Sequence, residues 1–248
     1  PQDTELVRSI VASLHESPAT MPRGGTLTAR RFLQLGLLLG SASGFEELHD
    51  LLELARCPPP NASGSSARAE GGQISLPDHF LLEVEAAQQQ FETNPIYWLL
   101  HESIYCDGFA EGAARGPSSW AAERVQASLE QWDYTSRLAE GAPPVLLSGE
   151  HVYSWMGEDY AWLRPLMPVA EVLAHKSDWG PLYDPAILGS SRCPPVAALV
   201  SYEDLYVERT FSEATAAMLG GKVRLWITNE FQHSGLRDQP EVVFERLL

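Results

Sequence analysis

The stretch PPVAALVSYEDLYV, residues 194–207, decides the fold class that we expect for this chain. Its apolar run from Val196 to Ser201 is typical of a buried strand. A helix is predicted next in FSEATAAML, residues 211–219, and a second buried strand in KVRLWIT, residues 222–228. Strand, helix and strand in this order, with strands that are apolar on both faces, indicate an α/β arrangement with parallel pairing. A helix in QPEVVFERLL, residues 239–248, continues the pattern.

Upstream of this stretch the alternation begins at Pro143. The run PPVLLSG, residues 143–149, predicts another buried strand, and a helix is expected over residues 163–175. Before residue 142 the spacing of apolar residues predicts only helices, over residues 4–14, 28–39, 45–56, 77–91, 94–105 and 119–132. Ser43 and Glu46 match a capping box at the start of the third of these helices. The sequence therefore divides into a helical region, 1–142, and an α/β region, 143–248.

One segment of the helical region is low in complexity. Residues 58–72, PPPNASGSSARAEGG, are rich in Pro, Ser, Gly and Ala, which bury little apolar surface. We interpret residues 57–74 as a flexible insertion.

Composition excludes several classes of function. The formal net charge of −16 disfavours binding to nucleic acid or to an anionic membrane surface. No apolar run approaches the roughly 18 residues that span a bilayer. Three separate cysteines, Cys57, Cys106 and Cys193, form no CxxC pair and are expected to be reduced thiols in the cytoplasm. Neither a metal nor a cofactor is expected, because the histidines show no ligand spacing.

Residues with catalytic chemistry follow the two best predicted strands. Glu203 and Asp204 come after the first strand and His233 after the second. Active-site groups of open α/β sheets lie at the carboxyl ends of strands, and an acid followed by a histidine matches two members of a Ser-His-Asp triad. The imidazole moves the hydroxyl proton and the carboxylate fixes its tautomer. The alternative is that Asp204 caps a loop and His233 is a surface residue.

Five segments together resemble one family. LHESIYC (100–106), GEHVYSWMGEDY (149–160), DWGPLYDP (178–185), VSYEDLYV (200–207) and ITNEFQHSGLR (227–237) are similar to segments of proline iminopeptidases, serine peptidases that release an N-terminal proline. The resemblance implies a partial α/β-hydrolase fold, with a helical cap in 1–142 and the C-terminal part of the hydrolase domain in 143–248. It implies Asp204 as the triad acid, with Glu203 as the alternative, and His233 as the base.

The same resemblance implies substrate-binding residues. Cap glutamates of the family bind the free α-amino group of the substrate, and Glu102 and Glu150 are the candidates here. Aromatic residues form the wall of a proline pocket, and the candidates are Tyr153 and Trp155, with Tyr105 and Trp98 nearby; Trp98 is also interpreted as a core residue. His151, Ser154 and Gly157 depart from the family pattern, which has Met, Pro and Phe there, and they predict a smaller and more polar pocket wall.

The nucleophile is missing from the sequence. No serine stands in a Gly-x-Ser-x-Gly elbow, and the family's oxyanion segment, His-Gly-Gly-Pro-Gly, is absent. We therefore expect that the chain begins beyond the nucleophile and is inactive alone. Its expected partners are the missing N-terminal half and a peptide with a free N-terminal proline. The alternative is a non-catalytic binding or regulatory protein built on a hydrolase remnant.

Overall fold

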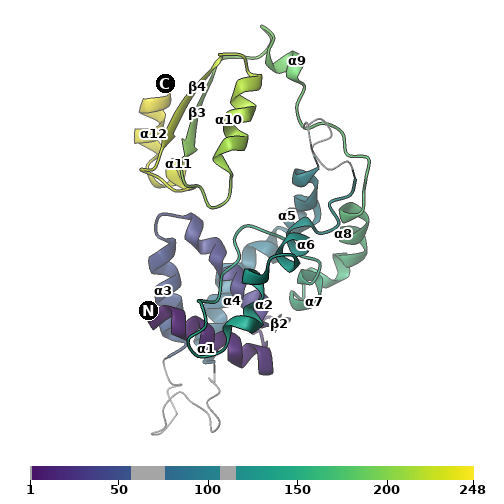
Figure 1. Cartoon of the computed structure of the whole chain (residues 1–248), viewed down its shortest axis with the longest axis vertical. Helices are drawn as coiled ribbons and strands as arrows, with labels where there is room; N and C mark the ends of the chain where they lie inside the picture. Colours follow the sequence, from purple (N-terminus) through teal and green to yellow (C-terminus); the bar gives the residue numbers. More distant parts are fainter. Residues whose placement is uncertain (1, 57–75, 107–115) are drawn as a thin grey trace.

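The computed structural model describes residues 2–56, 76–106 and 116–248, and the predicted insertion at 57–74 lies outside them. Two parts are visible (Figure 1). We call residues 2–174 the helical body and residues 185–248 the C-terminal lobe. An irregular segment, residues 175–184, connects them along one side.

The helical body contains the helices that the sequence predicts; α1 is longer than predicted, and several of the others are broken into an α-helix and a 3-10 helix. Its α-helices are α1 (Gln2–Glu16), α2 (Ala29–Leu33), α3 (Gly44–Leu54), α4 (Asp78–Thr93), α5 (Pro95–His101), α6 (Ala121–Ala127), α7 (Met156–Asp159) and α8 (Met167–Ala174). Short 3-10 helices are η1 (Gln34–Gly40), η2 (Glu102–Tyr105), η3 (Glu130–Trp132), η4 (Tyr134–Arg137) and η5 (Arg164–Leu166). A two-residue antiparallel pair, β1 (Ala19–Thr20) with β2 (Thr26–Leu27), follows α1.

The helix predicted over residues 28–39 changes its geometry after Leu33. Thr28 caps α2 by accepting the backbone N–H of Arg31, and the chain then tightens into η1. Gly36 allows residues 147 and 148 to approach, because a Cβ there would overlap the Ser148 carbonyl oxygen. The capping box at Ser43 is wrong in detail: the Ser43 hydroxyl donates to Glu47 instead of accepting a backbone N–H.

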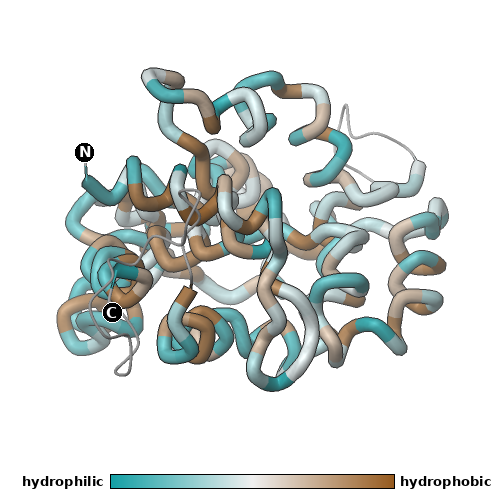
Figure 2. Tube along the Cα trace, turned by 90° about the horizontal axis from the view of Figure 1, so that it is seen from below, coloured by the Kyte–Doolittle hydropathy of each residue, from teal (hydrophilic) through white to brown (hydrophobic). Residues whose placement is uncertain are grey.

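Two apolar cores stabilise the helical body. The first gathers fully buried residues of α1, α2 and α4, such as Ile10, Phe32 and Phe80. The second surrounds Trp98 and Tyr160 and includes residues of α8. Figure 2 shows hydrophobic segments running through the interior of the helical body. Among the described residues, all buried hydrophobic residues except Leu219 and Val243 lie in the helical body. Each large one stabilises the folded state by about 1.5–3 kcal/mol.

The strand predicted over residues 143–149 is wrong. This segment has no regular secondary structure and belongs to neither of the sheets of the described residues. Its apolar residues Val145 and Leu147 pack into the first core, and the Ser148 N–H donates to the Leu33 carbonyl over 2.9 Å. The apolar run is therefore buried against helices instead of against neighbouring strands.

The C-terminal lobe confirms the predicted order of strand, helix and strand. The predicted burial of the strands is wrong for the described structure, because the strand side chains other than Ser201 are half-buried or exposed. Strands β3 (Val196–Ser201) and β4 (Val223–Thr228) pair in parallel, in register from Val196↔Val223 to Ser201↔Thr228. Helix α10 (Arg209–Met218) connects them, and α9 (Pro185–Leu188), α11 (Gly235–Asp238) and α12 (Pro240–Leu247) complete the lobe. The strands lie between α10 and α12 (Figure 1). The chain as described is thus mostly helical with one parallel strand pair.

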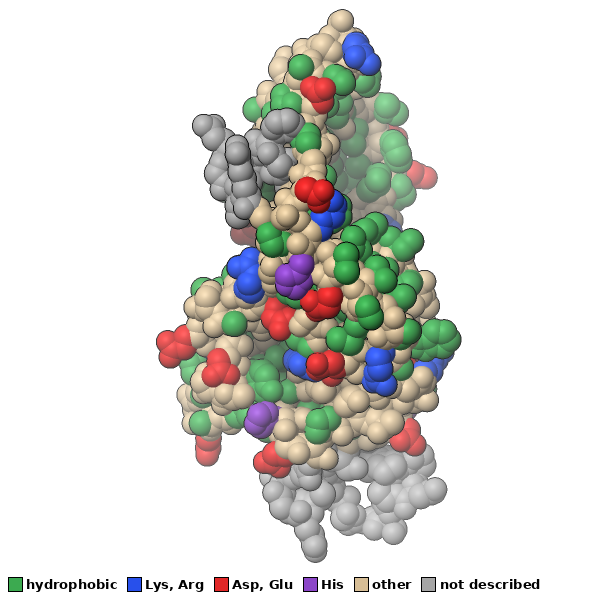
Figure 3. All heavy atoms as spheres, turned by 90° about the vertical axis from the view of Figure 1, so that its right-hand side faces the viewer, with side chains coloured by type: hydrophobic (Ala, Val, Ile, Leu, Met, Phe, Trp, Pro, Cys, Tyr) green, Lys and Arg blue, Asp and Glu red, His purple; other side chains and the backbone are tan. Residues whose placement is uncertain are grey.

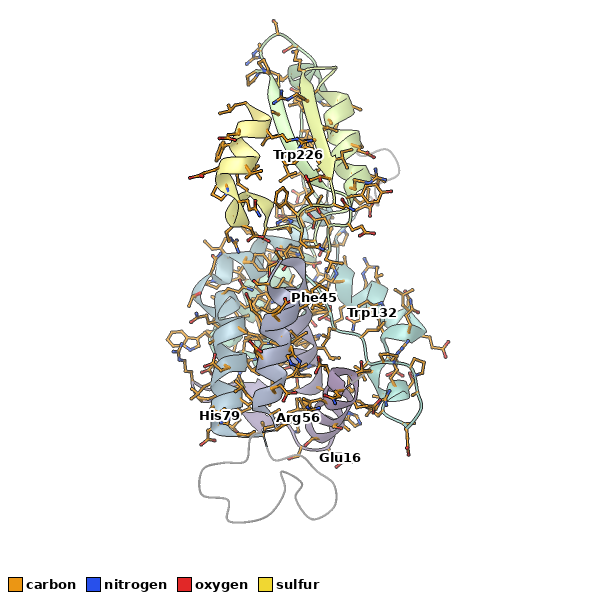
Figure 4. The ribbon with its side chains drawn as sticks, turned by 90° about the vertical axis from the view of Figure 1, so that its left-hand side faces the viewer. Glu16, Phe45, Arg56, His79, Trp132 and Trp226 are labelled. Atoms are coloured by element: carbon orange, nitrogen blue, oxygen red, sulfur yellow. The ribbon has the colours of Figure 1, made fainter. Side chains whose placement is uncertain are left out.

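Trp226, a residue of β4, contacts Arg246 of α12 (Figure 4). Its ring lies edge-on to Phe231 at 5.9 Å, and the Arg246 guanidinium lies 4.4 Å from its centroid. The helices of the described residues include none with both the length and the apolar composition that spanning a bilayer requires.

Candidate functional site

Asp204 and His233 meet beyond the carboxyl ends of β3 and β4. Ser201 and Thr228 are paired at the last position of the register, so the loops that follow them begin side by side. His233 Nδ1 lies 2.9 Å from Asp204 Oδ2. The other carboxylate oxygen, Oδ1, accepts the backbone N–H groups of Tyr206 (2.8 Å) and Val207 (3.0 Å). The acid is therefore held by several hydrogen bonds at once.

The two side chains differ in exposure. The Asp204 side chain is 10% exposed and that of His233 is 45% exposed. Because a carboxylate only accepts hydrogen bonds, the contact assigns the proton to Nδ1 and leaves Nε2 as an acceptor. A hydroxyl group placed at Nε2 could give up its proton there, which is the task of a triad base.

A pocket of about 480 Å³ lies beside this pair, between the helical body and the C-terminal lobe. His233 and Tyr206 line it from the lobe, and Glu150 and Tyr97 line it from the helical body. Glu150, a predicted amine-binding residue, therefore shares a pocket with His233. Glu150 Oε1 accepts a hydrogen bond of 2.8 Å from the Tyr97 hydroxyl.

Tyr97 was not predicted from the sequence. Burial and the neighbouring Glu150 carboxylate raise the pKa of its hydroxyl, which keeps it a neutral donor. Tyr97, His101 and Tyr105 follow one another at four-residue intervals along α5 and η2. That spacing is the only signal in the sequence that could have grouped Tyr97 with the predicted site.

Glu102, the other predicted amine-binding residue, is 1% exposed. Its Oε2 accepts the Ala121 N–H at the start of α6 over 3.0 Å, and its Oε1 has no hydrogen-bond partner among the described residues. It is not among the residues that line the pocket beside His233. A carboxylate at a helix N-terminus also has a structural role, because it satisfies a free backbone N–H.

The predicted aromatic residues lie in or near the second core, to which Tyr153 belongs and against which Trp155 packs, and two of them also line a second pocket. Trp98 lies in the second core, where its indole donates to the Tyr153 carbonyl over 3.0 Å. Tyr105 and Tyr153 line a mostly apolar pocket of about 310 Å³. Tyr153 stacks on Trp155 at 4.9 Å, and burial raises the pKa of Tyr153 to about 12.

Two histidines flank Tyr105, and one of them, His151, also lines this second pocket. The Tyr105 hydroxyl lies 3.0 Å from His101 Nε2 and 3.4 Å from His151 Nδ1. Burial lowers the pKa of His101 to about 4 and also lowers that of His151. Both imidazoles are therefore neutral at pH 7. His101 was not predicted as part of a site.

Glu203 is exposed and, within the described part of the chain, has no hydrogen-bond or ion-pair partner. Of the two adjacent acids, Asp204 is the one that contacts His233.

One group of possible metal ligands occurs elsewhere, on the surface. Ligand atoms of Asp3, His49 and Glu53 lie within 4.8 Å of one another. Asp3 already accepts a hydrogen bond from His49, which raises the pKa of that imidazole, and Glu53 pairs with Arg56. These existing partners favour an ion-pair network over a metal centre.

Comparison with known proteins agrees with the resemblance seen in the sequence. No protein-family model matches the chain. A proline iminopeptidase of Aeromonas sobria is 38% identical over 248 residues, all of this chain and 51% of the relative. The proline iminopeptidase aneH of Aspergillus aculeatus is 29% identical over 252 residues, again all of this chain and 49% of the relative. The chain is thus similar over its whole length to proline iminopeptidases and spans about half the length of these curated relatives.

Proposed function

We propose that this chain is the cap and the acid–base part of a prolyl aminopeptidase with a partial α/β-hydrolase fold. Asp204 and His233 are the triad acid and base, and the serine nucleophile comes from residues outside this sequence. The observation that carries the proposal is the 2.9 Å hydrogen bond between Asp204 and His233 at the ends of adjacent parallel strands. Similarity to two proline iminopeptidases along the whole chain supports the same assignment.

The chemistry follows from the protonation of the pair. His233 Nε2 takes the proton of the serine hydroxyl as the oxygen attacks the carbonyl of the N-terminal residue. The resulting imidazolium is stabilised by Asp204 and gives the proton to the leaving amine. Water then repeats the sequence on the acyl-enzyme and releases the amino acid. The backbone N–H groups of Tyr206 and Val207 hold the Asp204 carboxylate in place throughout.

The substrate is a peptide with a free N-terminal proline. Glu150 is well suited to bind the α-ammonium group, because its carboxylate lines the pocket that His233 also lines. A charge-assisted hydrogen bond to the ammonium would select unblocked N-termini. Tyr97 orients Glu150 by its hydrogen bond. Glu102, Glu203, Tyr153 and Trp155 remain proposed contributors to substrate binding.

The proposal extends to organisation and location. Residues 1–142 form the cap and residues 143–248 the C-terminal part of the hydrolase domain. Further strands supplied with the nucleophile would pair with β3 and β4, since a sheet of two parallel strands needs neighbours and, in the part of the chain that the structure describes, each of these strands pairs only with the other. A cytoplasmic location fits the described cysteines, Cys106 and Cys193, which are free thiols.

A chimera tests this function. In the Aeromonas sobria relative, the half that matches this chain is replaced by this chain, and hydrolysis of a proline arylamide is measured. We expect turnover that depends on a free proline amine and falls by about 10³-fold or more in His233→Ala. The chain alone is the negative control. A folded chimera whose turnover survives His233→Ala would contradict the proposal.

A further inference from the structure

Tyr206 contacts both members of the Asp204–His233 pair. Its backbone N–H donates to Asp204 Oδ1 over 2.8 Å. Its ring lies against the imidazole of His233, with 4.8 Å between centroids and planes tilted by 58°. One residue therefore restrains the rotamer of the acid and the rotation of the base.

The same residue is anchored in the helical body. The Tyr206 hydroxyl donates to the Leu37 carbonyl in η1. Its ring occupies the space beside Gly40, where a Cβ would overlap ring atoms. The Gly40 carbonyl in turn accepts the His233 N–H over 3.2 Å. The end of η1 thus holds the ring that restrains the base and also the backbone of the base.

Segment 37–41 also borders the pocket beside the pair. Leu37, Leu38 and Ser41 line the pocket together with Glu150 and His233. A ligand in that pocket touches the segment that anchors Tyr206. A ligand that contacts residues 37–41 could therefore change the geometry of the Asp204–His233 pair through Tyr206.

We propose that Tyr206 is a positioning residue that couples the Asp204–His233 pair to residues 37–40 of the helical body. The proposal rests on the proposed function for its catalytic meaning. Gly40 is needed for this coupling, because only a residue without a side chain leaves room for the Tyr206 ring. Any side chain at position 40 would displace the ring and, with it, the imidazole.

Nuclear magnetic resonance of the chain with isotope-labelled histidine tests the coupling without turnover. The signals measured are the ring protons of His233, which feel the Tyr206 ring current, and its Nδ1 proton in the hydrogen bond to Asp204. We expect Tyr206→Leu to shift the ring protons toward their positions in an unfolded chain and to broaden the Nδ1 proton. Tyr206→Phe keeps the ring and the backbone N–H but loses the hydroxyl that donates to Leu37, so it should shift the His233 signals less than Tyr206→Leu does.

Gly40→Ala is the second, independent variant, since it changes no atom of the pair or of Tyr206. We expect it to shift the same His233 signals as Tyr206→Leu. Tyr202→Leu is the matched control, because Tyr202 is an exposed tyrosine of the same loop, and it should leave them unchanged. Unchanged His233 signals in Gly40→Ala and in a Tyr206→Leu chain with a cooperative thermal transition would overturn the proposal.

Turnover in the chimera separates this inference from the proposed function. With an active chimera, Tyr206→Leu should lower kcat by about 10–100-fold with little change in KM, because misplacing a catalytic group by about 1 Å costs up to 10²-fold. Tyr206→Phe, which keeps the ring but loses the hydroxyl bond to Leu37, should lower kcat less than Tyr206→Leu does. If the chimera is inactive while the His233 signals respond as expected, the function fails and the coupling stands. If turnover is normal in Tyr206→Leu, the positioning role is contradicted and the function stands.

Discussion

The helical body and the C-terminal lobe bury their apolar side chains to very different extents. Within the described residues, the buried hydrophobic side chains of the lobe are Leu219 and Val243, whereas both apolar cores belong to the helical body. Large apolar side chains are instead exposed on the lobe, among them Phe211 and Phe244. Hydrophobic side chains also reach the surface of the helical body on the side that carries α8 (Figure 3). A core thus stabilises one part, while the other part depends on its neighbours.

This difference has a functional meaning under the proposed function. The residues that bind substrate come mainly from the part with its own cores, and the acid and base come from the part without one. The acid and base are placed by contacts of His233 and Tyr206 to η1 and by a contact of Ser234 to Ala42, just after η1. Substitutions in the two parts should therefore have different effects on stability, substrate binding and association.

Truncating a core aromatic residue of the helical body should have the largest effect on stability. Phe80 is fully buried, so Phe80→Ala should lower the free energy of unfolding by about 3–5 kcal/mol. Phe244 of α12 is 54% exposed, and Phe244→Ala should change it by less than about 0.5 kcal/mol. Chemical denaturation of the chain measures both. Equal losses would show that the lobe has a core of its own.

Removing the charge of Glu150 should weaken substrate binding in the chimera. Glu150→Gln should raise KM for a proline arylamide by about 30-fold, since losing one partner of a charge pair costs 2 kcal/mol or more. Glu102→Gln is the matched variant, and it keeps an oxygen for the Ala121 N–H. We expect it to have the smaller effect. A larger rise in KM for Glu102→Gln would move the amine site to Glu102.

Acid should destabilise the helical body through His101. Burial depresses its folded-state pKa to about 4, below the value near 6.5 in the unfolded chain. The stability that comes from the neutral His101 is fully present above pH 6.5 and is lost as the pH falls toward 4, because between these values the unfolded chain binds a proton that the folded chain does not. Between pH 7 and pH 5 the loss from this group is about 2 kcal/mol.

Thermal or urea unfolding at both pH values measures this loss. His101→Gln should remove most of it, and the exposed His175→Gln should not. A pH dependence that is the same in His101→Gln as in wild type would contradict the buried neutral imidazole.

Exposed apolar residues of the lobe should affect association more than stability. Phe211 on α10 is 71% exposed. Phe211→Ser should reduce self-association in sedimentation velocity while changing the free energy of unfolding by less than about 0.5 kcal/mol. Phe45, at the end of α3 that is nearest to the lobe (Figure 4), is the matched control in the helical body. Equal effects of Phe45→Ser would remove the contrast between the two surfaces.

The sequence predicted the lobe better than it predicted the segment before it. Strands β3 and β4 and helices α10 and α12 follow from local apolar patterns and are confirmed. The apolar run at 143–149 has the same pattern, but its Val145 packs against helices. Periodicity cannot distinguish a strand from an apolar segment that packs on helices, so tertiary contacts decide which of the two forms.

The site shows the same limit. That Asp204 and His233 would lie near each other could be predicted, because parallel strands bring their carboxyl ends to one edge. The contacts of Tyr97 with Glu150 and of Tyr206 with Gly40 join distant parts of the sequence. Such pairs depend on tertiary packing, within the helical body for Tyr97 and Glu150 and between the helical body and the lobe for Tyr206 and Gly40, and no local pattern encodes that packing.

Labelling by a fluorophosphonate, which reacts with an activated serine, tests the central claim most directly. The probe is applied to the chimera that carries this chain, to its His233→Ala and Asp204→Asn variants, and to His175→Ala as the control. The account predicts rapid labelling of the chimera and of His175→Ala, and strongly reduced labelling when His233 or Asp204 is changed. Labelling at the wild-type rate without His233 would show that the Asp204–His233 pair does not activate the nucleophile.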